Sequence, residues 1–240
     1  MLVVAVLKDD FLYVLTSRYS LYKINPEDGR VLWANRYWNE SDNRVTLYEQ
    51  TGVIFVGTHL IFGTPQGELK VVDANSGELI YTRPLMEKVS AFQDVSALVA
   101  GPEVLYASSY SAGIVAFGAE LGLRLFKLPD EHGITQLLYQ GGSLFAASAR
   151  GFLISIDPIT GKVLWKKKCL SGTPAPLLFQ DGVLYAGSSS GPILLVEPKQ
   201  GRILDRLNIS GTFSGFGFFG DVLYTLTKHG FLAAYKGCVS

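Results

Sequence analysis

Histidines and serines are the residues of this chain whose chemistry could support metal binding or acid–base catalysis. The three histidines, His59, His132 and His229, do not have the close spacing of metal-ligand pairs. If their loops share one rim of the fold, the imidazoles could converge on a metal or act as acid and base; the favoured alternative is solvated loop histidines. The serine runs 108–111 and 188–191 look like nucleophile loops. Neither lies on the strand-to-helix elbow of a G-x-S-x-G nucleophile, and serine hydroxyls stabilise tight turns.

A five-residue turn with glycine in its fifth place recurs along the chain. Its clearest copy, Asp157-Pro158-Ile159-Thr160-Gly161, lies between two apolar runs in the stretch 151–165, a pattern typical of a β-hairpin. The other copies end at Gly29, Gly77, Gly122 and Gly201. Four residues after each glycine, the same position holds Trp33, Tyr81, Phe126, Trp165 and, as a departure, Asp205. A large ring in a fixed place indicates one packing position that is used repeatedly.

Two further apolar segments precede each turn, so each module contains four candidate strands. The second strands are expected at 12–14, 54–56, 105–107, 144–146, 184–186 and 223–225, and the first strands at 2–7, 45–48, 95–100, 135–139, 176–179 and 214–219. In the second module this leaves an apolar excursion at 58–66. Four short strands repeating every ~40 residues predict an all-β fold, a six-bladed β-propeller of four-stranded antiparallel blades with an incomplete last blade. We expect one domain over residues 1–240.

Composition limits the class of protein and its partners. Lys and Arg total 21 and Asp and Glu total 21, so neither a nucleic acid nor an anionic membrane is expected as the main partner. Residues 1–7 are too short for a signal sequence or a membrane span, which predicts a cytoplasmic location by default, or a periplasmic or extracellular one if a leader has been removed. Cys169 and Cys238 are expected to lie too far apart for a disulfide. The lysines at 166–168 are expected to protect an outer strand edge.

The motif D-x-x-T/S-G-K/E-x-L-W at Asp157–Trp165, together with V-L-Y-A-G-S at Val183–Ser188, resembles the PQQ-like β-propeller repeat. The resemblance covers essentially the whole chain. This superfamily includes quinone-dependent alcohol dehydrogenases and non-catalytic BamB-like propellers, and the chain is closest in character to the latter. The resemblance implies the blade rather than dehydrogenase chemistry, because the dehydrogenases' adjacent Cys-Cys pair is absent and the acidic residues lie mainly in turns.

Loops at one face of the predicted propeller are the best candidates for function, because loops vary on a constant scaffold. The turns between second and third strands and the links between blades share that face. There we place these partner-binding candidates: Arg18, Tyr19, Trp38, His59, Phe62, Tyr110, Arg150 and His229. Trp38 and Phe62 are the most specific candidates, because the repeat requires neither. The alternative is that both side chains fold back over a blade as local caps.

We therefore expect a non-catalytic scaffold that binds a protein partner, with no catalytic residue, cofactor or metal site. The alternative is a small-ligand or quinone-dependent oxidoreductase-like propeller with its site at the central channel.

Overall fold

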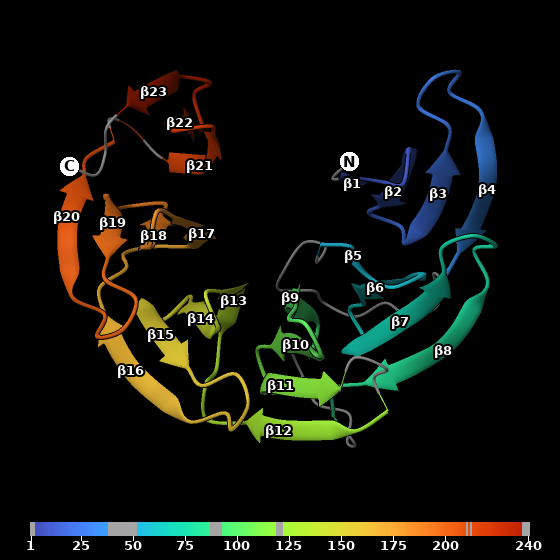
Figure 1. The fold of residues 1–240 in the computed structure, drawn as a ribbon, viewed down its shortest axis with the longest axis horizontal. Helices are drawn as coiled ribbons and strands as arrows, with labels where there is room; N and C mark the ends of the chain where they lie inside the picture. The colour runs from blue at the N-terminus through green and yellow to red at the C-terminus, as the bar shows by residue number, and fades with distance from the viewer. Residues whose placement is uncertain are drawn as a thin grey trace. The chain divides into compact units, whose positions relative to one another are not determined.

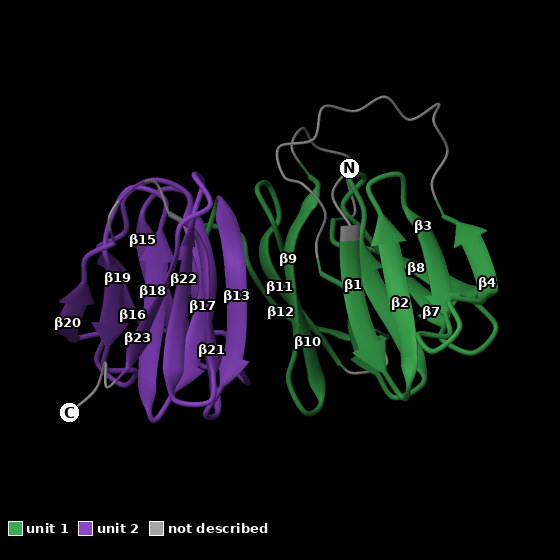
Figure 2. Ribbon diagram, turned by 90° about the horizontal axis from the view of Figure 1, so that it is seen from above, with its two compact units in different colours: residues 1–132 green, residues 133–240 purple. Residues whose placement is uncertain are grey.

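All regular structure in the described part of the chain is β-strand. The computed structural model describes residues 3–37, 52–86, 93–118, 122–209, 211 and 213–236. In these ranges no helix has the length and apolar character that a membrane crossing would need. The strands form six antiparallel sheets, which divide between two compact units, residues 1–132 and 133–240 (Figure 2).

Unit 1 contains three sheets of four strands, and strands that are consecutive in the sequence are neighbours in each sheet (Figure 1). Sheet 1 is β1 (Val3–Lys8), β2 (Phe11–Thr16), β3 (Ser20–Ile24) and β4 (Val31–Arg36). Sheet 2 is β5 (Ile54–Val56), β6 (His59–Gly63), β7 (Glu68–Asp73) and β8 (Leu79–Pro84). Sheet 3 is β9 (Val95–Ala100), β10 (Val104–Ser109), β11 (Gly113–Gly118) and β12 (Arg124–Leu128).

Unit 2 repeats this arrangement, except that its last sheet has three strands in the described residues. Sheet 4 is β13 (Ile134–Gln140), β14 (Ser143–Ser148), β15 (Phe152–Ile156) and β16 (Val163–Lys168). Sheet 5 is β17 (Pro174–Gln180), β18 (Val183–Ser188), β19 (Ile193–Val196) and β20 (Ile203–Leu207). Sheet 6 is β21 (Phe213–Phe219), β22 (Val222–Thr227) and β23 (Leu232–Lys236). Below, the strands of each sheet are lettered A to D in chain order.

Each unit is held together by apolar side chains packed between successive sheets. In unit 1, Leu15 and Leu21 of sheet 1 pack with Leu60 and Phe62 of sheet 2. In unit 2, Phe145 of sheet 4 packs with Leu184 of sheet 5. The central strands are therefore covered on both faces, and all six residues of β18 are buried. Two-sided burial explains why these strands are apolar runs without a clear alternation.

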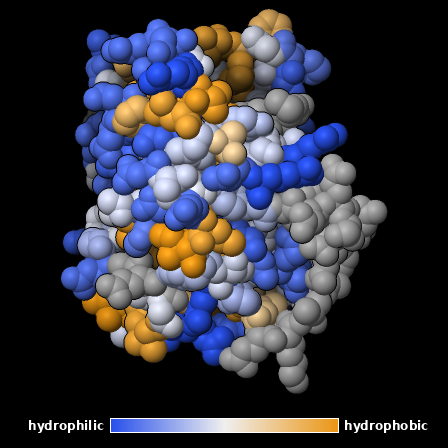
Figure 3. All heavy atoms as spheres, turned by 90° about the vertical axis from the view of Figure 1, so that its right-hand side faces the viewer, coloured by the Kyte–Doolittle hydropathy of each residue, from blue (hydrophilic) through white to orange (hydrophobic). Residues whose placement is uncertain are grey.

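The D strands are the outer edges of the sheets and are mostly exposed. Examples are β4 and β16. On the face of the molecule drawn in Figure 3, exposed apolar side chains form small patches surrounded by polar ones. Scattered exposed apolar side chains are ordinary on a folded protein and mark no site by themselves.

The prediction of six modules with an incomplete last sheet is confirmed in the described residues, but the assignment within the second module is wrong. The run 54–56, expected to be a second strand, is the first strand of its sheet, and the expected excursion at 58–66 contains the second strand, β6. The expected first strand at 45–48 lies outside the described residues.

Candidate functional site

The order of strands gives every sheet two different ends. In an antiparallel sheet with consecutive neighbours, the A–B and C–D turns lie at one end, and the B–C turns and the links to the next sheet lie at the other. We call the first end the C–D rim. The second end is the B–C rim, and its turns are 17–19, 64–67, 110–112, 149–151, 189–192 and 228–231.

The C–D rim is built from one turn design that satisfies its own polar groups. In the turn of sheet 4, the Asp157 carboxylate accepts hydrogen bonds from the Ile159 and Thr160 backbone N–H groups and from the Thr160 hydroxyl. The Gly161 N–H donates to the Asp157 carbonyl at 2.9 Å, with Gly161 at φ 74°. The bonds from Thr160 hold the pKa of Asp157 below its usual value.

The same design recurs in the C–D turns of sheets 2 and 5. Asp73 accepts from Asn75 and Ser76, and Glu197 accepts from Lys199 and Gln200. The pKa of Asp73 is likewise lowered, mainly by the Ser76 backbone N–H. These acidic side chains serve the turns that contain them.

Aromatic rings of the preceding sheet cover the glycines of these turns. Trp33 of β4 packs on the turn of sheet 2 so closely that a Cβ on Gly77 would lie 2.7 Å from its ring. Trp165 of β16 packs on Gly201 in the same way, and its Nε1 donates to the Pro198 carbonyl at 2.8 Å. At Trp33 and Trp165 the repeated aromatic position therefore joins one sheet to the next, and these two C–D turns are occupied by structural contacts.

Four of the sequence-predicted binding residues lie on B–C turns and are exposed. They are Arg18 and Tyr110 in unit 1, and Arg150 and His229 in unit 2. Tyr19 shares the first of these turns, but its side chain is only 7% exposed and its ring stacks on Phe62. Burial, with a smaller contribution from Asp94, raises the pKa of Tyr19 to about 12. Tyr19 thus has a packing role in the structure.

Two placements predicted from the sequence are wrong. His59 begins β6 at the A–B turn and pairs with Asp73, so it lies on the C–D rim. Phe62 lies within β6 with 0% of its surface exposed, in the core between sheets 1 and 2. Both errors follow from treating β6 as a loop. Trp38 lies outside the described residues.

The histidines of unit 1 do not come together. His59 is on the C–D rim, whereas His132 follows β12 at the other end, with its Nδ1 3.2 Å from the Tyr110 carbonyl oxygen. His229 belongs to unit 2. Within the described ranges no group of three or more His, Cys, Asp or Glu side chains could hold a metal ion. The carboxylates of Asp73, Asp157 and Glu197 are engaged by the backbone of their own turns, so among the described residues they form no donor set for a quinone and its metal.

The serine run at 188–191 lies in the β-hairpin between β18 and β19, which is not a nucleophile elbow. The Ser189 hydroxyl accepts a hydrogen bond from the Thr173 N–H at 2.9 Å, and Ser188 accepts from the Ser171 N–H at 3.2 Å. A hollow of about 540 Å³ lies beside this turn. It is lined by Ser189, Ser190, Gly191, Pro192, Asn208, Ile209 and Gly211. Its groups can donate and accept hydrogen bonds but carry no charge.

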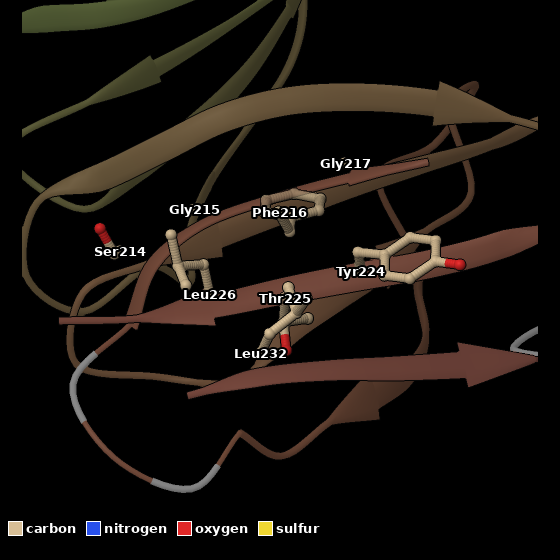
Figure 4. Close-up of a pocket in the computed structure, with 8 residues that line it drawn as sticks. All are labelled: Ser214, Gly215, Phe216, Gly217, Tyr224, Thr225, Leu226 and Leu232. Atoms are coloured by element: carbon tan, nitrogen blue, oxygen red, sulfur yellow. The ribbon is translucent and has the colours of Figure 1, made fainter. Parts of the chain in front are cut away.

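A second hollow, of about 300 Å³, lies on sheet 6 and is mainly apolar (Figure 4). Phe218 and Leu223 of this sheet pack on sheet 5. The hollow is lined instead by Gly215 and Gly217 with Tyr224, and by Leu226 and Leu232, which are 44% and 68% exposed. Glycines leave the surface of β21 flat there.

Two phenylalanines at the B–C rim of unit 2 were missed in the sequence. Phe152 and Phe231 each follow a short turn with the pattern basic residue, Gly, Phe, in Arg150-Gly151-Phe152 and His229-Gly230-Phe231. Phe152 is covered by Lys166 and Lys168 of β16, whose Nζ atoms lie 4.7 and 6.0 Å from its ring centroid. Phe231 is the last residue of the B–C turn before β23 and is 73% exposed. This shared basic–Gly–Phe pattern is the feature of the sequence from which both phenylalanines could have been identified.

Comparisons with known proteins agree with this geometry. A family model described as "Outer membrane protein assembly factor BamB" matches residues 3–167. Proteins of that name from Shewanella oneidensis and Vibrio cholerae are 26% and 27% identical, over 65% and 69% of this chain. A polyvinylalcohol dehydrogenase from a Pseudomonas species is 25% identical over 61% of this chain. The chain spans only 26% of the length of that dehydrogenase, and 40% and 33% of the two assembly factors.

Solved structures show the fold. BamB from Moraxella catarrhalis superposes with a TM-score of 0.79 at 16% identity, over 97% of this chain and 71% of that one. The computationally designed Ika8 protein gives a TM-score of 0.69 at 14% identity, over 97% and 82% of the two chains. The all-β, six-bladed propeller with an incomplete last blade is thus confirmed as the fold class. Because the matched residues 3–167 exceed half of the 240-residue chain, the protein belongs to the PQQ-like propeller family described as outer membrane protein assembly factor BamB.

Proposed function

We propose that this protein is a non-catalytic scaffold that binds another protein through the B–C rims of its units and acts in outer membrane protein assembly. One observation carries the proposal. The C–D turns of sheets 2, 4 and 5 satisfy their own acidic side chains, and those of sheets 2 and 5 are also covered by a tryptophan ring. The B–C turns instead present Arg18, Tyr110, Arg150 and His229, which the repeat does not require. Recognition by exposed Arg and aromatic side chains is typical of protein interfaces.

The role in assembly comes from the family and from the names of the two assembly factors. It favours a location in the cell envelope. The cytoplasmic default expected from the amino terminus has no support in these relatives. We further propose that residues 1–240 form a single domain.

Site-specific photo-crosslinking in the native cell tests the proposal. A photoreactive residue at Tyr110 or His229 on the B–C rim should crosslink to a protein of the assembly machinery. The matched positions Glu27 and Lys199 are exposed on the C–D rim and should give no such product. Crosslinking from the C–D rim alone, or equal crosslinking from both rims, would contradict the proposed surface.

The rival function is a small-ligand or quinone-dependent oxidoreductase, and the similarity to a polyvinylalcohol dehydrogenase is the observation that favours it. It predicts that purified protein incubated with pyrroloquinoline quinone and a divalent cation reduces an artificial dye when an alcohol is added. The scaffold proposal predicts no dye reduction above that of a heat-denatured control.

A further inference from the structure

Charge is unevenly distributed between the two rims of unit 2. Residues 133–240 contain ten Lys and Arg against five Asp and Glu. Four of the five acidic residues lie in A–B or C–D turns: Asp157, Asp181, Glu197 and Asp221. They are balanced at that end by Lys162, Lys199, Arg202 and Lys236. The excess positive charge therefore lies on the D strands and the B–C rim.

The cations in that excess come from all three sheets. They are Arg150, Lys166, Lys167 and Lys168 of sheet 4, Arg206 of sheet 5 and Lys228 of sheet 6, with Asp205 the one acidic residue not in a turn of the other rim. His229 follows Lys228. Lys167 of sheet 4 and Arg206 of sheet 5 both act on the Cys169 thiol and lower its pKa against the larger, raising effect of burial.

Three of these cations converge on one aromatic ring. The Arg150 Cζ, Lys166 Nζ and Lys168 Nζ atoms lie 5.9, 4.7 and 6.0 Å from the Phe152 ring centroid. The ring attracts each cation, but three positive charges around one ring repel one another. A carboxylate placed among them would reduce this repulsion, and the planar guanidinium of Arg150 can bind it through two parallel hydrogen bonds.

The surface beside this cluster is suited to a peptide backbone. The hollow of sheet 5 is lined by Ser190 and Asn208 at the same rim, and the B–C turn of sheet 6 carries Lys228 and the exposed Phe231. A lipid surface or a nucleic acid would need the positive charge but not an uncharged, hydrogen-bonding hollow on the same rim. An extended peptide uses both kinds of group.

We infer that the B–C rim of unit 2 binds an acidic peptide segment of the partner protein, with Arg150 and Lys168 contacting its carboxylates. The inference rests on the proposed scaffold function and specifies the class of ligand that the scaffold binds.

Binding of a fluorescein-labelled decapeptide of alternating Glu and Ser, followed by fluorescence anisotropy, tests the inference. We expect binding that weakens as salt is added. The double variant Arg150→Glu/Lys168→Glu should weaken it at least tenfold. The control Lys162→Glu/Lys199→Glu changes the net charge equally on the opposite rim and should stay within about twofold, because charges farther than a Debye length are screened.

Several outcomes would overturn the inference. They are an equal loss in the control variant, no loss in the Arg150/Lys168 variant, or tighter binding to single-stranded DNA or to vesicles containing phosphatidylserine that depends on the same two residues. If charge reversal impairs folding, Arg150→Gln/Lys168→Gln replaces it, with a smaller expected loss. If crosslinks from Tyr110 or His229 identify a partner while peptide binding ignores Arg150 and Lys168, the ligand class fails and the scaffold function stands.

Discussion

A carboxylate that accepts three hydrogen bonds makes the stability of its turn depend on pH, and Asp157 is such a group. Its pKa is lower in the folded protein than the ~3.9 expected of an unfolded chain. The stability that its charge contributes is therefore present above about pH 4 and is lost as the pH falls through the lowered pKa.

The substitution Asp157→Asn keeps an oxygen acceptor and removes this charge. We expect the melting temperature of the variant to lie below that of the wild type at pH 6 and the difference to shrink as the pH is lowered towards 2.5. Thermal unfolding followed by circular dichroism across this range gives the answer. Glu27→Gln, at an exposed turn residue, is the control and should show no such trend. A difference that grows in acid would refute the assigned direction.

The contacts between successive elements differ at the two docked tryptophans, although the sheets repeat. Trp165 Nε1 donates to the Pro198 carbonyl, while the corresponding carbonyl in sheet 2, that of Ala74, accepts from the Tyr13 hydroxyl instead at 3.2 Å. Trp33 Nε1 is consequently buried without a hydrogen-bond partner among the described residues. An unmade hydrogen bond in a buried group costs stability.

Phenylalanine at these positions tests that difference. Trp165→Phe should destabilise the protein by about 1 kcal/mol more than Trp33→Phe, because only the former loses a hydrogen bond and leaves a carbonyl unsatisfied. Urea denaturation of both variants measures the two free energies of unfolding. Equal losses would show that the bond to Pro198 adds nothing to the ring packing.

The strands of five sheets could be predicted from the sequence, and the error in the second sheet had an avoidable cause. The second strand of each module contains a leucine thirteen positions before the first residue of the turn, as in Leu144 and Asp157 or Leu184 and Glu197. Leu60 and Asp73 have the same separation. The run 54–56 was chosen as the second strand because its residue types resemble those of the other second strands. β-branched and aromatic residues suit a first strand equally well, so residue type does not separate the two. Strict spacing would have placed Phe62 in the core.

The candidate site was only partly predictable, because a turn can be located in the sequence while the direction of its side chains cannot. Arg18 and Tyr19 are adjacent in one B–C turn, yet the first is exposed and the second is buried against Phe62. The exposure of Phe231 compared with Phe152 depends on whether a D strand covers it. Such cover is a property of the neighbouring strand.

At the scale of the whole molecule, the formal net charge of zero is the sum of an acidic half and a basic half. Residues 1–132 contain eleven Lys and Arg against sixteen Asp and Glu, the reverse of the excess in residues 133–240. Balance over the whole chain argued against an anionic partner, but a partner meets a local surface. Charge therefore has to be assigned to rims and units before it is used to exclude a class of ligand.

The proposal of a single domain makes the final prediction, because the sheets of a repeat array depend on their neighbours for burial. If residues 1–240 are one domain, calorimetry should show one transition whose calorimetric and van't Hoff enthalpies agree. Trp165→Ala should then lower the temperature of that entire transition, since removing the ring opens a cavity between sheets 4 and 5 and costs about 3 kcal/mol.

If the two compact units unfold independently, the same substitution should split the calorimetric trace instead. The part due to residues 133–240 would melt earlier, while the part due to residues 1–132 would keep its temperature. Trp33→Ala, which removes the matching ring in unit 1, would then affect the other part. The two variants together separate a cooperative propeller from two adjacent folding units, because only a cooperative domain transmits the loss in one unit to the unfolding of both.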